Sequence, residues 1–148
     1  MYSNDANVIP FPSSNADRAR LTFQQAEQQL TILNRELASL AAMRDCAPDE
    51  WERRAADPTV RVRGITEYLP ALPEAVPATD TRRALERQRL EIACEALSDW
   101  LEASGETLYR LGSPDDRERR QACTDLRLRL RELEHGLMNL RFAFDDIA

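Results

Sequence analysis

This chain contains no lysine, and all of its 20 basic residues are arginine. The absence excludes every site that depends on a lysine amine, such as a P-loop lysine, a Schiff-base lysine or a lysine general base. The single histidine, His135, excludes most histidine-based catalysis. Acidic residues outnumber arginines, and the formal net charge of −6 argues against non-specific binding to nucleic acid.

Cysteines and long apolar runs are also scarce. Cys46, Cys94 and Cys123 are far apart in the sequence, which indicates reduced thiols and a cytoplasmic location. No stretch approaches the roughly 20 apolar residues of a membrane-spanning helix, so we expect no membrane partner. Residues 1–14 lack the features of a secretory signal and are predicted to be a flexible tail. Without a glycine-rich phosphate loop or a Cys/His metal spacing, we expect no cofactor, no bound metal and no catalytic residue.

The chain does have apolar residues at alternating steps of three and four along three stretches. They are Ala16, Ala19, Phe23, Ala26, Leu30, Leu33, Leu37 and Leu40; Leu90, Cys94, Leu97, Leu101, Leu108 and Leu111, with Ser104 as a polar member; and Cys123, Leu126, Leu130, Leu133, Leu137, Leu140, Phe144 and Ile147. This spacing is typical of helices packed side by side. It predicts an all-α fold in which three long helices, over residues 15–46, 80–111 and 114–147, form an elongated bundle or coiled coil.

Two segments join these predicted helices. Gly112, Ser113 and Pro114 end one helix and start the next, and so short a joint predicts that the second and third helices form an antiparallel hairpin. The other segment, residues 47–79, contains recurrent prolines and is predicted to be a long connector with a short helix over 48–56. We therefore expect one helical domain over residues 15–148, with the direction of its first helix left open.

We call the three rows of apolar residues given above the seams of the predicted helices. Some apolar residues fall outside these seams. Leu85, Ile92, Leu128 and Phe142 fall opposite the seams, and Met138 falls at a neighbouring outer position. If the hairpin turns near residue 112, all five lie toward the end away from the turn, with Leu85 level with Leu140 and Ile92 level with Leu133. Such a patch is either covered by the proline-containing connector or used as an interface for a homodimer or a partner protein.

Two further stretches have alternative readings. Ile9, Pro10, Phe11 and Pro12 form either a peptide motif that docks on a partner or a tail segment that folds onto the nearest groove. The acids of the second predicted helix recur at steps of three and four and form either a solvated face or an acidic strip that meets a basic partner; they are Glu91, Glu95, Asp99, Glu102 and Glu106.

These observations favour a non-enzymatic helical module for protein–protein interaction, acting as an adaptor, inhibitor or assembly factor. One alternative is a nucleic-acid-associated regulator that uses the arginines of the third predicted helix, although these are interleaved with acids. A second is a dimeric metal-carboxylate enzyme, because Glu132 and His135 have the Glu-x-x-His spacing of di-iron bundles. Only one copy of that spacing is present, so a dimer would have to supply the other.

Overall fold

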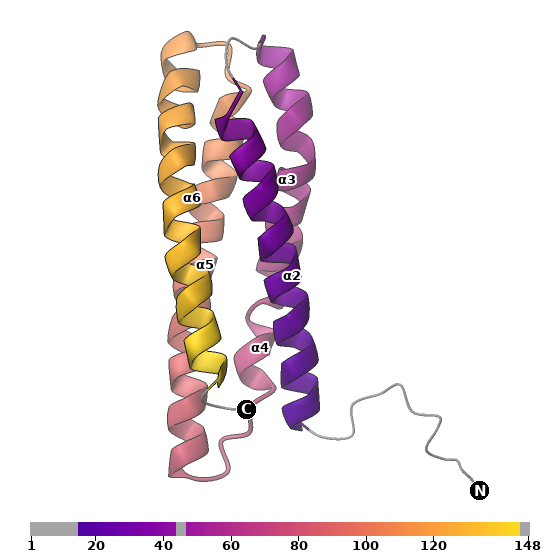
Figure 1. Cartoon of the computed structure of the whole chain (residues 1–148), viewed down its shortest axis with the longest axis vertical. Coiled ribbons are helices and arrows are strands. Elements are labelled where there is room, and N and C mark those ends of the chain that lie inside the picture. Colours follow the sequence, from indigo (N-terminus) through magenta and orange to yellow (C-terminus); the bar gives the residue numbers. More distant parts are fainter. Residues whose placement is uncertain (1–14, 44–46, 146–148) are drawn as a thin grey trace, which may run out of the picture.

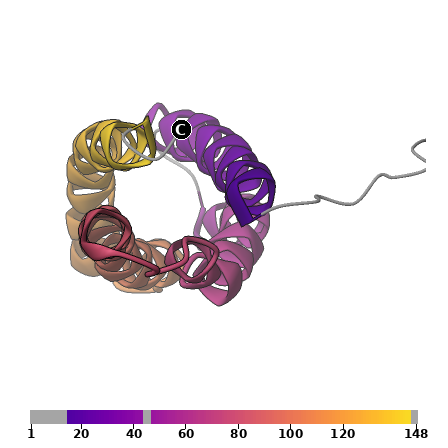
Figure 2. The same ribbon diagram turned by 90° about the horizontal axis from the view of Figure 1, so that it is seen from below.

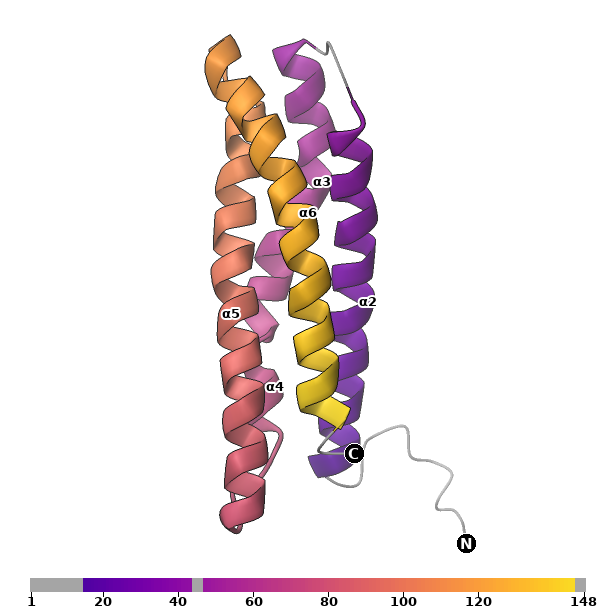
Figure 3. The same cartoon turned by 60° about the vertical axis from the view of Figure 1, so that its left-hand side comes forward.

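Four long helices lie side by side, and each runs in the opposite direction to the long helix before it in the chain (Figure 1, Figure 3). The computed structural model describes residues 15–43 and 47–145. Viewed from one end, the helices surround a common axis, with α2 beside α3 and α6, and α5 beside α3 and α6 (Figure 2). The prediction of an all-helical bundle is confirmed, because the described part of the chain contains helices and no strand.

The first predicted seam forms the buried face of α2, Asn15–Ala41. Six of its side chains, from Ala19 to Leu37, are nearly or fully enclosed. Phe23 stacks on Phe144 of α6 with ring centroids 4.2 Å apart. The helix ends earlier than the predicted residue 46, and residues 44–46 lie outside the described part of the chain.

The prediction of a short helix over 48–56 is wrong, because α3 spans Pro48–Tyr68 and is the fourth long helix of the bundle. It starts with Pro48 in its first turn, where a missing N–H costs nothing, and continues through Pro58. A proline inside a helix costs about 3 kcal/mol. Continuing past it buries Val62 and Ile65, and each such burial contributes about 1.5–3 kcal/mol. Tertiary packing therefore offsets the local cost of the proline.

The rest of the predicted connector is short and packed. Leu69 is fully buried where α3 ends, and the single turn of α4, Ala71–Glu74, buries Leu72 and Pro73. Val76 is also enclosed. Because α3 has 21 residues and α5 has 31, this segment occupies the space beside the first turns of α5 that α3 does not reach (Figure 1).

The helices α5, Thr81–Leu111, and α6, Asp116–Asp145, begin and end close to the predicted residues. Asp80 caps α5 by accepting a hydrogen bond from the Arg83 backbone N–H at 2.8 Å. In the turn, Ser113 Oγ accepts from the Asp115 N–H at 3.1 Å, and α6 starts one residue later. Every predicted seam residue of α5 is buried, including Ser104.

Close contacts set the register between α5 and α6. The Trp100 indole N–H donates to the Arg129 carbonyl at 2.9 Å. A Cβ on Gly136 would lie only 2.8 Å from Leu97 Cδ2, so the two helices approach closely because position 136 carries no side chain. None of the described helices has the length and apolar character needed to cross a membrane.

Candidate interaction surfaces

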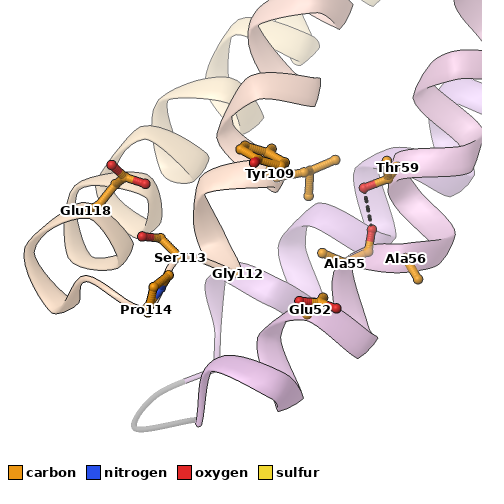
Figure 4. Close-up of a pocket in the computed structure, with 10 residues that line it drawn as sticks. Glu52, Ala55, Ala56, Thr59, Tyr109, Gly112, Ser113, Pro114 and Glu118 are labelled. Carbon is orange, nitrogen blue, oxygen red and sulfur yellow. Dashed lines mark hydrogen bonds between the residues drawn. The ribbon is translucent and has the colours of Figure 1, made fainter.

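A groove of about 570 Å³ opens at the end of the bundle where α5 turns into α6 (Figure 4). Three elements form it: the first half of α3, the last turn of α5 and the start of α6. Its lining residues are Glu52, Ala55, Ala56, Thr59, Leu108, Tyr109, Gly112, Ser113, Pro114 and Glu118. The groove is therefore a tertiary feature that no one of these segments forms alone.

Small side chains of α3 leave the space that the groove occupies. Ala55 and Ala56 project only a methyl group each. The Thr59 hydroxyl donates its proton to the Ala55 carbonyl at 2.6 Å, so its donor is used within the helix. A Cβ on Gly112 would lie 3.6 Å from Glu52 Cβ, so the end of α5 packs close to α3 here. These contacts hold the walls of the groove in place.

Tyr109 lies at the edge of the groove on the last turn of α5 (Figure 4). It is 83% exposed, whereas the neighbouring Leu108 is 2% exposed and anchors the same turn in the core. An aromatic ring on a fixed helix presents a large apolar surface with few rotatable bonds. This combination of an exposed ring and an adjacent groove is typical of protein-binding sites.

Two acidic residues at the groove have no ion-pair partner in the part of the chain that the structure describes. Glu52 of α3 and Glu118 of α6 lie on opposite sides of Gly112, and both are exposed (Figure 4). Neither forms an ion pair with any residue in the described ranges. Two carboxylates that no arginine neutralises therefore border the groove.

The acids of α5 continue this negative surface along the helix. Glu91, Glu95, Asp99, Glu102 and Glu106 are all exposed, and Tyr109 follows Glu106 at the same three-residue step. We call these five acids the α5 acidic stripe. No arginine occurs between Glu91 and Tyr109. Like charges at this spacing repel each other by a few tenths of a kcal/mol per pair, so the stripe slightly destabilises its own helix.

Other acids of the molecule are paired with arginine across helices. Arg61 of α3 donates to Glu36 of α2 at 2.7 Å. Arg110 of α5 donates to Asp125 of α6 at 2.6 Å, and this hydrogen bond is the main reason that the pKa of Asp125 lies below its ordinary value. Cross-helix pairs of this kind fix neighbouring helices, which the α5 acidic stripe does not do.

The five predicted interface residues are all exposed, at 44–65% of their surface, so the connector does not cover them. Arg110 of α5 forms an ion pair with Asp125 of α6. Ile92 precedes Arg110 by five full helical turns, and Leu85 precedes Ile92 by about two, so both lie on the same side of α5, toward α6. Arg141 pairs with Glu27 of α2. Phe142 lies about 100° around α6 from Arg141, on the side away from the buried face, and Met138 lies between these two directions, so both point outward from the bundle.

The observed register also differs from the expected one. Leu97 meets Gly136, which places Ile92 near the level of Phe142 and not of Leu133. Leu128 lies beside Arg129 at the level of Trp100, and about 22 Å of helix separate that level from Leu85. The structure brings Ile92, Met138 and Phe142 to one level but leaves Leu128 apart from Leu85.

Three other features noted in the sequence are the single histidine, Cys94 and the predicted docking motif. His135 is exposed on α6, and no group of three or more potential metal-ligating side chains occurs among the described residues. Cys94 is 4% exposed, and its burial raises the pKa of the thiol to about 12. The predicted docking motif from Ile9 to Pro12 lies outside the residues that the structure describes.

Sequence analysis missed Tyr109 and the groove beside it. A signal for Tyr109 was present, since it follows a seam residue, Leu108, and continues the spacing of the α5 acidic stripe. No local signal indicated the groove, because α3 was expected to end before Pro58 and its small residues had no assigned neighbour.

Comparison with known proteins gives no match: no protein-family model, no curated protein and no solved structure is similar to this chain.

Proposed function

We propose that this chain is a non-enzymatic helical module that binds another protein in the cytoplasm, and that the groove beside Tyr109 is its docking site. The observation that carries the proposal is the 83% exposure of a tyrosine at the edge of a groove with small and apolar lining residues. Burying a tyrosine ring contributes roughly 3–5 kcal/mol before the costs of association. One side chain of the partner would occupy the groove, and the Tyr109 ring would pack against the adjacent side chain of the partner. Together these contacts would form a compact binding centre.

The rigidity of the groove supports the same role. Its walls come from helices that are fixed by the enclosed Trp51 and Leu111, so little conformational entropy is lost when a partner binds. Protein-binding sites commonly combine such a preformed pocket with a central aromatic residue.

Site-specific photo-crosslinking in native cells tests this proposal. With p-benzoylphenylalanine in place of Tyr109, we expect one discrete crosslinked product. The product should be lost with Ala56→Gln, which fills the groove with a neutral side chain, and retained with Ala38→Gln, a matched change at an exposed position of α2. The proposal fails if no product forms, or if Ala56→Gln leaves the product unchanged.

A second candidate is self-association through the exposed residues Leu85, Ile92, Leu128, Met138 and Phe142. These exposed apolar side chains on the neighbouring helices α5 and α6 favour it. Phe142→Arg should then raise the monomer fraction measured by light scattering. An unchanged mass distribution would argue against this interface.

The arginines of α6 give less support to nucleic-acid binding. Arg129 pairs with Glu132, Arg141 pairs with Glu27 of α2, and Arg119 pairs with Asp116. Phosphate contacts to these three arginines would have to displace their carboxylates, and the exposed α5 acidic stripe adds charge that repels a polyanion.

A further inference from the structure

We propose that the partner segment is a basic amphipathic helix, which places one apolar side chain in the groove beside Tyr109 and lies with arginines or lysines along the α5 acidic stripe. This inference rests on the proposed function and names the chemistry of the partner. A protein segment of opposite charge fits this surface, because the groove adjoins a row of carboxylates that form no ion pair with any described residue.

The geometry of the stripe sets the length and periodicity of the partner. About 27 Å of helix separate Glu91 from Tyr109, so a helix of about five turns would match it. The acids recur at steps of three and four. A facing helix with basic residues at the same steps would present one charge opposite each carboxylate.

Charge complementarity favours this occupant over others. Glu52 and Glu118 extend the negative surface to both sides of the groove, and neither they nor the stripe acids form an ion pair among the described residues. Other carboxylates, such as Glu36 and Asp125, are neutralised by arginines of the neighbouring helix. A nucleic acid has the wrong sign, and the described residues contain no cluster of ligands that would hold a metal ion on this face.

The position of Tyr109 distinguishes this surface from an ordinary solvated face. Tyr109 lies at the edge of the groove (Figure 4). In sequence it continues the spacing of the α5 acidic stripe, so one straight segment would contact the carboxylates and the ring together. A solvated face would require no such continuity with an apolar pocket.

Selection from a random peptide library displayed on yeast tests the inference with the full chain. Peptides are selected for binding to the wild-type chain and against binding to the Ala56→Gln variant, so that only groove-dependent binders are enriched. We expect these binders to carry an excess of arginine and lysine at steps of three and four around one apolar residue. Groove-dependent binders without this basic bias would overturn the inference and leave the proposed function standing. Failure to enrich any groove-dependent binder would overturn both.

Charge-matched variants then locate the contact with one synthetic peptide from the enriched set. Glu102→Gln with Glu106→Gln should weaken its binding at least tenfold at low salt. Glu67→Gln with Glu74→Gln removes the same charge from exposed, unpaired positions on α3 and α4, and should change the affinity less than twofold. Equal weakening by both pairs would mean that only net charge attracts the peptide, which contradicts the inference. The Glu102 and Glu106 effect should also shrink as salt is raised, because screening weakens exposed ion pairs.

Discussion

The close approach of α5 and α6 at Gly136 makes a paired prediction with an internal control. A Cβ built on Gly136 lies 2.8 Å from Cδ2 of Leu97, which is 1% exposed and cannot move into solvent. A Cβ on Gly64, four residues before the end of α3, has no atom within 4 Å. Both residues are interior helical glycines, so alanine gives each position the same gain in helix propensity, about 1 kcal/mol.

The two substitutions should therefore change the free energy of unfolding by amounts that differ in sign or size. Gly64→Ala should raise the free energy of unfolding by about 0.5–1 kcal/mol. At Gly136 the added methyl group overpacks the core at a cost of about 1–3 kcal/mol, so the net effect should be neutral or destabilising. We expect Gly136→Ala to be less stable than Gly64→Ala by about 1–3 kcal/mol, or roughly 2–10 °C in Tm.

Urea denaturation followed by far-UV circular dichroism measures both free energies. A double-mutant cycle with Leu97→Ala assigns the effect, since Gly136→Ala should become favourable once the Leu97 side chain is gone. If Gly136→Ala stabilises the protein as much as Gly64→Ala, the close packing of α5 on α6 described above is refuted.

Three further outcomes are expected. Because burial raises the pKa of Cys94 to about 12, its alkylation in the native protein at neutral pH should be far slower than in urea, as measured by mass spectrometry of that cysteine. The lowered pKa of Asp125 means that its pair with Arg110 stabilises the fold above the carboxyl's unfolded pKa and is lost as pH falls through the folded pKa. Asp125→Asn should therefore flatten the decline in Tm between neutral and acidic pH by an amount equivalent to about 1 kcal/mol, and an unchanged profile would contradict the assignment. Tyr109→Ala should change the free energy of unfolding by less than about 0.5 kcal/mol, whereas Leu108→Ala should cost about 2–5 kcal/mol; a large loss at Tyr109 would mean that the ring is structural.

The sequence determined the features that depend on short-range periodicity and capping. The three seams predicted which faces of α2, α5 and α6 are buried, and Asp80 and Gly112 marked the ends of α5. These predictions succeed because a helix repeats every 3.6 residues and its caps are local hydrogen bonds. The exposed, outward position of the α5 acidic stripe followed from the same register.

Tertiary structure alone decided three other features. Pro58 lies inside α3 because burial of Val62 and Ile65 against neighbouring helices offsets its local cost. The register between α5 and α6 depends on the fit of Leu97 against Gly136, which periodicity does not specify. The groove beside Tyr109 exists because the first half of α3 meets the α5–α6 turn, about 50 residues further along the chain, at one end of the bundle. The spacing of apolar residues at steps of three and four determines which face of each helix is buried. The candidate binding site depends instead on the position of each helix along the axes of its neighbours.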